Sequence, residues 1–103
     1  MSFYEQLTGI CAPLGIDVAY GSFREDSKLP CLIYLGDGAQ NAVADNRVYH
    51  SAPDWRLEYY YTLKDEEKEQ AFEQALTDGG FIWEKGGDTY ISDEAIFVIY
   101  YDL

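Results

Sequence analysis

The sequence predicts one α+β domain, a small and mainly antiparallel sheet with two helices packed on one face and a protruding β-hairpin or loop. Two stretches support this prediction. Residues 55–63 alternate between apolar and polar side chains, which is the period of a strand, and from Asp65 the apolar residues recur as on one stripe of a helix. Residues 95–101 contain no charge and are typical of another strand. A chain of 103 residues suits one core, so we expect no domain boundary within 1–103.

The first expected element is a short helix that begins at Ser2, which forms an S-x-x-E capping box with Glu5. Apolar residues follow at helical spacing until Pro13 and Gly15, which end the helix. A short strand is then expected at 17–20.

A long β-hairpin is expected in the middle of the chain. A polar loop at 21–30 leads into an apolar run at 31–35, which is typical of a strand covered on both faces. Residues 36–46 are rich in Gly, Asn and Asp, which favour turns, and residues 47–50 are strand-like again. After a short break at 51–53 comes the central strand. We expect the two extended segments and their connection to reach out of the body of the domain.

The second half of the chain is expected to hold a helix and a further hairpin. Asp65 is a suitable N-cap, acidic residues follow it where the helix dipole favours negative charge, and Gly79 with Gly80 ends the helix. Strands are expected at 81–84 and 89–91, and the residues between them are predicted to form a turn.

The last strand, 95–101, is apolar on both faces, because Ile96, Val98 and Tyr100 point one way and the apolar residues between them point the other. Two short helices cover one face of a sheet and not two, and an exposed apolar strand promotes aggregation. We therefore expect the chain to associate with copies of itself. The alternative is that the long hairpin or the 21–30 loop folds over the second face.

The chain is strongly acidic, with seven basic against nineteen acidic residues and a formal net charge of −12. This charge argues against wrapping DNA or binding an anionic membrane, because both functions need a positive surface. The acidity either serves solubility alone or lines a path that DNA passes without sticking. The ten tyrosines are either ordinary strand formers or interface residues.

The sequence contains no pattern typical of a catalytic, cofactor-binding or metal-binding site. The single histidine, His50, has no evident partner. Cys11 and Cys31 are expected to be buried reduced thiols, because two distant cysteines form neither a disulfide framework nor a zinc motif. The carboxylates of the second helix are expected to form a solvated face, and neither a secretion signal nor a membrane span is expected. We therefore expect a non-enzymatic binding or assembly protein without a cofactor or metal.

Several short motifs follow one another along the chain. They run from MSFYEQL and DVAYGSF through LPCLIYLG and ADNRVYH to FIWEKGGDTYI and FVIYYDL. Their order and spacing resemble the small tail-completion proteins of long-tailed phages and prophages of Gram-positive bacteria, which are head–tail joining or tail-terminator-like proteins. The resemblance covers nearly the whole chain, and its most distinctive part is the span from YLG to VYH.

The resemblance implies a structural protein of the virion tail that is assembled in the cytoplasm of the host bacterium. Such a protein forms a ring, usually of six copies, that caps the tail tube and joins it to the head connector. The implied partners are further copies of the chain, the tail tube protein and the head connector or completion protein, with DNA only in passage and no membrane. A monomer in solution that closes into a ring only on the tail tip is equally compatible with the resemblance.

The residues expected at subunit or tube contacts fall in the hairpin and on the last strand. They are Tyr34, Asp37, Asp45, Asn46, Arg47, Tyr49, Ile96, Val98 and Tyr100. The polar residues among them also suit turns. Two alternative functions remain open, a head-completion or connector-adaptor protein and a small acidic α+β regulator that binds a host protein. A hydrolase is disfavoured because no set of nucleophile and base is present.

Overall fold

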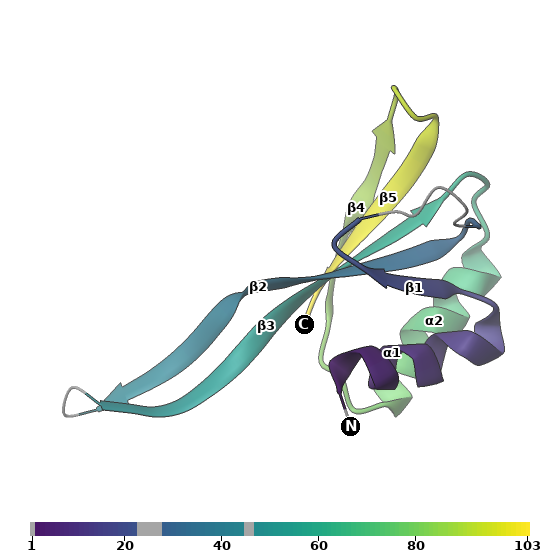
Figure 1. Cartoon of the computed structure of the whole chain (residues 1–103). Coiled ribbons are helices and arrows are strands. Elements are labelled where there is room, and N and C mark those ends of the chain that lie inside the picture. Colours follow the sequence, from purple (N-terminus) through teal and green to yellow (C-terminus); the bar gives the residue numbers. More distant parts are fainter. Residues whose placement is uncertain (1, 23–27, 45–46) are drawn as a thin grey trace.

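The computed structural model describes residues 2–22, 28–44 and 47–103, and the side chains of 2–22, 28–36 and 54–103. Within these residues it confirms the α+β fold, since five strands form one sheet in the order β1-β2-β3-β5-β4 and two helices pack against it (Figure 1). The strands are β1 (Asp17–Tyr20), β2 (Cys31–Ala44), β3 (Arg47–Tyr61), β4 (Glu84–Ile91) and β5 (Ile96–Asp102). The helices are α1 (Phe3–Cys11), which a 3-10 turn (Ala12–Leu14) follows, and α2 (Glu66–Asp78).

Both helices begin where the sequence predicts. The Ser2 hydroxyl accepts a hydrogen bond from the Glu5 N–H at 3.1 Å, and the Glu5 carboxylate accepts one from the Ser2 N–H at 3.3 Å. Asp65 Oδ1 accepts a hydrogen bond from the Lys68 N–H at 3.1 Å. These bonds pair donors that the first turn of a helix leaves free, and they fix the start of each helix. In the part of the chain that the structure describes, no helix is long and apolar enough to cross a bilayer.

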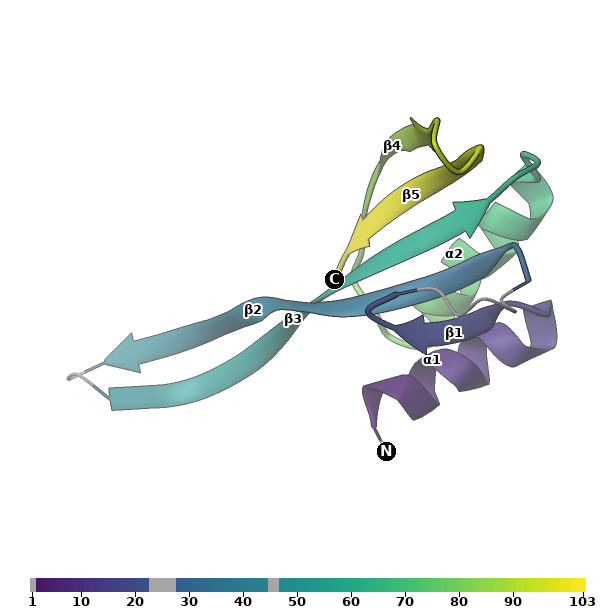
Figure 2. The ribbon, with the colours of Figure 1, turned by 45° about the horizontal axis from the view of Figure 1, so that its top comes forward.

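The sheet is antiparallel except at one edge. There β1 runs parallel to β2, with Asp17 opposite Cys31 and Tyr20 opposite Tyr34. β3 lies at the centre, paired with β2 on one side and with β5 on the other, and β4 forms the second edge. The sheet is strongly twisted, so that β4 and β5 run at an angle to β1 and β2 in Figure 2.

Three strands continue through residues that the sequence assigns to a break or a turn. Residues 36–44, expected to belong to a turn-rich connection, lie inside β2. Residues 51–53, expected to be a break, lie inside β3, where Pro53 pairs with a residue of β2. Residues 85–88, expected to form a turn, lie inside β4, and the strand expected at 81–84 contributes only its last residue. The register of β4 shifts within 85–88, so its two glycines form a bulge in an edge strand.

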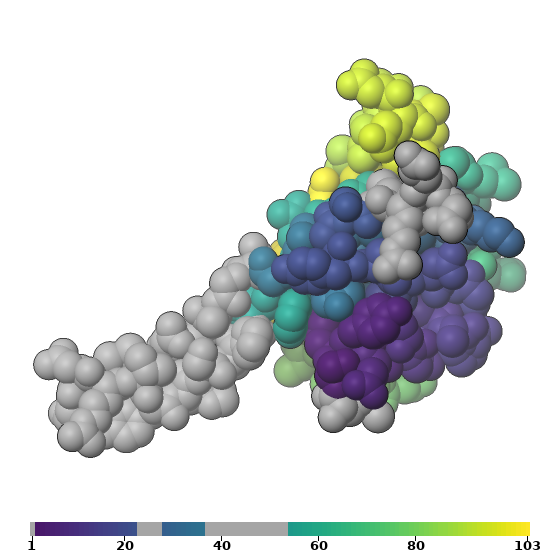
Figure 3. Space-filling view, viewed as in Figure 1, coloured from purple at the N-terminus to yellow at the C-terminus, as the bar shows by residue number. Residues whose placement is uncertain are grey.

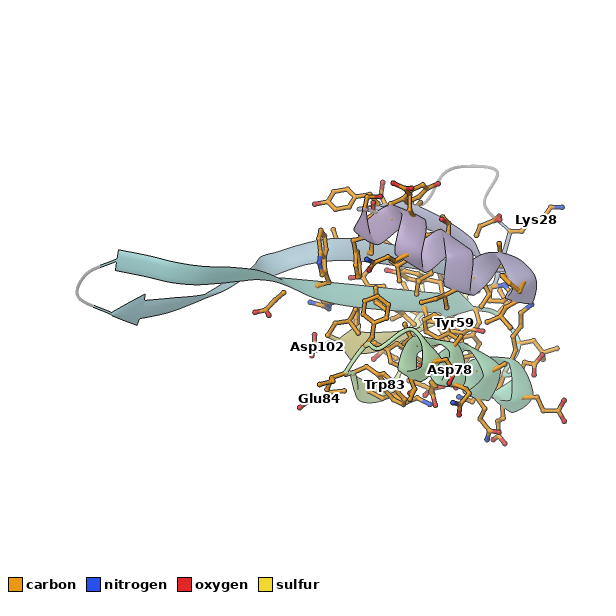
Figure 4. All side chains as sticks on the ribbon, turned by 90° about the horizontal axis from the view of Figure 1, so that it is seen from below. Lys28, Tyr59, Asp78, Trp83, Glu84 and Asp102 are labelled. Atoms are coloured by element: carbon orange, nitrogen blue, oxygen red, sulfur yellow. The ribbon has the colours of Figure 1, made fainter. Side chains whose placement is uncertain are left out.

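The core lies between the sheet and the two helices, which cover the same face (Figure 4). Viewed from below in Figure 4, Tyr59 lies between α1 and α2, and this agrees with its 1% exposure. The buried residues of this core include Leu7 and Cys11 of α1, Phe72 and Leu76 of α2, and Leu57, Tyr59, Tyr61, Ile99 and Tyr101 of the central strands. The alternating pattern that predicts the central strand is thus the pattern that fills the core.

The prediction that one face of the last strand stays uncovered is wrong for two of its residues. Ile96 and Val98 lie on the face away from the core, yet they are 7% and 0% exposed in a single copy. Val98 lies between Tyr60 of β3 and Thr89 of β4 in the sheet register. Ile96 and Val98 therefore offer almost no surface to another copy.

β2 and β3 continue to pair beyond the rest of the sheet, with register shifts between residues 36 and 39 and between 42 and 43 of β2. β1 pairs with β2 only at 31–34, and β5 pairs with β3 only at 56–61. From Gly36 and Trp55 outward, β2 and β3 pair with each other alone among the described strands. That this hairpin protrudes from the body of the domain stays a prediction.

Candidate interaction site

Five aromatic side chains surround the point at which β2 and β3 leave the wider part of the sheet. They come from the first turn of α1, the last residue of β1 and two diagonal positions of β2 and β3. They are Phe3, Tyr4, Tyr20, Tyr34 and Trp55, and we call them the aromatic cluster.

Tyr34 lies at the centre of the aromatic cluster. Its ring centroid is 5.6 Å from that of Phe3, 6.2 Å from Tyr4, 5.0 Å from Tyr20 and 5.8 Å from Trp55. Phe3 in turn stacks on Trp55, with the centroids 4.4 Å apart and the rings 7° from parallel. Tyr4 and Tyr20 are 46% and 61% exposed, so one side of the cluster faces solvent. Because tyrosine and tryptophan are enriched among interface residues, this surface is suited to binding another molecule.

The charges beside the aromatic cluster are negative. Glu5, Asp17 and Asp54 lie close to its members in the sequence. Arg56 follows Trp55 but points to the other face of the sheet, where its guanidinium carbon lies 4.2 Å from the centroid of the Tyr100 ring. The net charge of the chain is −12, and exposed aromatic rings on a strongly acidic protein favour a cationic partner.

A second group of side chains joins α2 to β4 and is charged throughout. Lys64 Nζ lies 2.8 Å from both carboxylate oxygens of Glu69 and 2.8 Å from Asp88 Oδ2. Lys85 Nζ lies 2.7 Å from Glu73 and 3.5 Å from Glu69. We call these five residues the lysine–carboxylate network. Glu69 is only 3% exposed, so the prediction of a solvated helix face is wrong there, because two lysines turn toward α2.

Two tyrosine hydroxyls complete the lysine–carboxylate network. The Tyr101 hydroxyl donates to Glu73 at 2.6 Å, and the Tyr61 hydroxyl donates to Asp88. Burial, followed by the hydrogen bond to Asp88, raises the pKa of Tyr61 to about 12. Burial and the bond to Glu73 also raise the pKa of Tyr101, so both hydroxyls remain protonated donors at neutral pH. Each of the three carboxylates thus has a lysine and each tyrosine has a carboxylate, which suits a structural joint.

The described residues offer little to reactive chemistry. Cys11 and Cys31 are buried free thiols, as predicted, and burial raises the pKa of each to about 12, with Asp17 adding to the rise at Cys31. A thiol with so high a pKa is protonated and unreactive at neutral pH. No three His, Cys, Asp or Glu side chains lie close enough together to hold a metal ion in the part of the chain described.

The lysine–carboxylate network makes stability depend on pH below neutrality. Partial burial alone raises the pKa of Asp88, but the hydrogen bonds from Lys64 and Tyr61 outweigh it and lower the pKa. A lowered folded-state pKa stabilises the fold above the pKa of an unfolded aspartate, about 3.9, and that stabilisation is lost as the pH falls through the folded value. We therefore expect the free energy of unfolding, measured by urea titration, to fall between pH 5 and pH 2.5. We expect a smaller fall in Asp88→Asn, and parallel curves for the two proteins would contradict this assignment.

The predicted contact residues fall into three groups. Tyr34 is at the centre of the aromatic cluster, and Tyr100 is half-buried beneath Arg56. Ile96 and Val98 are buried in one copy. The remaining predicted positions lie outside the described residues or side chains, and they are Asp37, Asp45, Asn46, Arg47 and Tyr49.

The sequence predicts a contact role for Tyr34 but not for the other four members of the aromatic cluster. Phe3 and Tyr4 belong to the expected helix, Tyr20 ends the expected β1, and Trp55 begins the expected central strand. The sequence assigns each of these four residues to a helix or strand, but the spacing of residues along the chain does not show that these elements meet around Tyr34. The sequence does give one general indication of such a surface. It contains ten tyrosines, a residue type that favours strands and is also enriched at interfaces.

The chain was also compared with known protein families and with curated proteins. No family model matches the sequence, and no curated protein matches it.

Proposed function

We propose that this chain is a non-enzymatic structural protein of a phage or prophage tail, acting at the junction of tail and head. In this proposal several copies close into a ring that caps the tail tube and presents a surface to the head connector. The proposal rests on the resemblance of its motifs to tail-completion proteins, which spans nearly the whole chain.

The observation that supports this proposal most is the pairing of β2 and β3. Beyond Gly36 and Trp55 these strands pair only with each other among the described strands. A two-stranded ribbon of this kind is at best marginally stable in water, so it gains stability from a partner surface. In a ring each copy contacts the next through two different patches, and the ribbon supplies one of them.

The charge of the chain fits a passage for DNA. A ring whose copies each carry a formal net charge of −12 would present a negative channel. Its carboxylates repel the phosphates of DNA, and because they displace no counterions from the DNA they give it no reason to bind. The same charge opposes close packing of copies in solution. We therefore expect assembly on the tail tube, where the tube supplies further contacts, to be stronger than assembly of the free protein.

The test is a tube-binding experiment with a shortened ribbon. Tail tubes that lack their terminal ring are mixed with the protein and imaged by negative-stain electron microscopy. We expect a ring of density at one end of each tube. In the shortened variant, residues 37–54 are replaced by Asn-Gly, which closes Gly36 and Trp55 into a two-residue hairpin turn. We expect this variant to fold but to leave tube ends bare.

The control replaces the exposed turn residues 92–94 by Gly-Ser-Gly, which leaves the ribbon intact and should still cap tubes. Circular dichroism and urea unfolding confirm that each variant is folded. Capping by the shortened variant would exclude the ribbon as the contact. Binding to purified heads and not to tubes would favour a head-completion protein, and binding to neither would overturn the proposal.

A further inference from the structure

A groove of about 550 Å³ is lined by α1, β1 and the start of β2. One wall is formed by Tyr4 and Thr8 of α1 and by Ala12 of the 3-10 turn, which are spaced four residues apart and lie beside the buried stripe of Leu7 and Cys11. β1 and the start of β2 supply the rest of the described lining. Figure 3 shows α1 and β1 together on the face turned to the viewer. The groove is therefore bordered along its length by an edge strand.

The outer edge of β1 is open to pairing. Among the described strands β1 pairs with β2 alone, over Asp17 to Tyr20. In such a pair alternate residues direct their N–H and C=O groups away from the partner strand, so about half of the backbone groups of β1 face outward. Unpaired backbone groups at a sheet edge are a template for another strand. The Tyr20 carbonyl already accepts a hydrogen bond from the Ser22 N–H, and an extended peptide would pair with the outward groups that remain.

The two ends of the groove carry different side chains, and both kinds favour a positively charged ligand. Asp17 stands at the start of β1 and lines the groove beside Cys31, whose pKa is raised by burial first and by the charge of Asp17 second. Tyr20 stands at the end of β1, beside Tyr34 and the rest of the aromatic cluster. No lysine or arginine occurs among the residues described as lining the groove. A carboxylate and exposed aromatic rings along one strand edge both attract a cationic side chain.

We propose that the free edge of β1 binds, by strand addition, an extended segment of another protein that carries lysine or arginine side chains. The backbone of the segment pairs with β1, one basic side chain reaches Asp17, and another lies against the rings of Tyr20 and Tyr4. Strand addition of this kind uses main-chain hydrogen bonds for affinity and alternate side chains for selectivity.

A second copy of this chain is a poorer occupant of the groove than a basic partner. Each copy has nineteen acidic residues and seven basic residues, so an approaching copy brings a net negative charge to an already negative groove. This inference goes beyond the proposed tail function, and the result of the tube-binding experiment neither supports nor contradicts it.

The test is a titration of the ¹⁵N-labelled full chain, followed by NMR, with a capped (Thr-Lys)₅ peptide in 50 mM salt. We expect saturable shifts of the amides of 17–20 and slower hydrogen exchange at the outward N–H groups of β1. A (Thr-Glu)₅ peptide should give no saturable shift, and N-methylation of every residue of (Thr-Lys)₅ should weaken binding at least tenfold. Raising the salt to 300 mM should weaken the binding of (Thr-Lys)₅ as well.

Matched variants locate the site. We expect Tyr20→Ser to weaken binding about fivefold and Asp17→Asn about threefold, because the first removes a ring at the end of β1 and the second removes a charge from the groove. Tyr90→Ser and Asp93→Asn are the controls, since Tyr90 is 53% exposed on the opposite edge strand and Asp93 lies in an exposed turn. Both controls should bind as the parent does.

Three results would overturn the proposal. One is the absence of saturable shifts with (Thr-Lys)₅. The second is a set of shifts that maps to the acidic surface of α2 and is unchanged by Tyr20→Ser. The third is a shift of the β1 amides with protein concentration alone, together with a dimer in analytical ultracentrifugation that Tyr20→Ser abolishes, because this would make a second copy the occupant.

Discussion

Val98→Asp is expected to unfold the protein at room temperature or to leave it only marginally folded. Val98 is 0% exposed at the centre of β5, and a carboxylate placed there would lose its hydration without gaining a partner. We expect a loss of about 4 kcal/mol or more, against total stabilities of about 5–15 kcal/mol for domains of this kind. Far-UV circular dichroism and a urea titration measure the loss.

The matched control for Val98→Asp is Thr89→Asp. Thr89 is the cross-strand neighbour of Val98 on β4, but it is exposed at the sheet edge. The same charge at this position should cost at most about 1 kcal/mol, mainly from the low strand propensity of aspartate. If Val98→Asp were as stable as Thr89→Asp, the non-core face of β5 would be accessible, and the self-association predicted from the sequence would regain its basis.

Phe72→Ala is expected to destabilise the fold by about 3–5 kcal/mol. The Phe72 side chain is 0% exposed, and its ring centroid lies 5.4 Å from that of Tyr59 and 5.5 Å from that of Tyr101. Removing the ring leaves a cavity between α2 and the two central strands and removes both aromatic contacts. The midpoint of urea unfolding should fall accordingly, with an unchanged slope if the transition remains two-state.

Gln70→Ala controls for effects of the helix itself. Gln70 is an exposed residue of α2, two positions from Phe72, and alanine is the better helix former. We expect its unfolding midpoint to equal that of the parent or to exceed it slightly. A loss in Phe72→Ala no greater than 1 kcal/mol would mean that α2 is not packed on the sheet as described.

The elements that depend on local signals could be predicted from the sequence. The capping box at Ser2 places the start of α1 correctly. The N-cap at Asp65, together with the change from strand period to helix period there, places the start of α2 correctly. The burial of the last strand could not be predicted, because it depends on which strands flank it. β5 lies between β3 and β4, and Val98 is 0% exposed although the two helices cover the other face of the sheet.

The candidate site shows the same division. Tyr34 was expected at a contact surface, but its partners come from three separate segments whose meeting depends on the parallel pairing of β1 with β2. The lysine–carboxylate network was missed for a similar reason, since Lys85 was expected in a turn and instead lies in a strand that faces α2. Spacing along the chain carries no information about such long-range pairing.

The glycine bulge in β4 changes what this edge of the sheet offers to another molecule. Two glycines lie opposite the single residue Tyr100, and Glu84, Lys85 and Asp88 flank them. A bulge and charged side chains on an edge strand both hinder pairing with a strand of another molecule. The β4 margin is thereby protected against edge-to-edge aggregation.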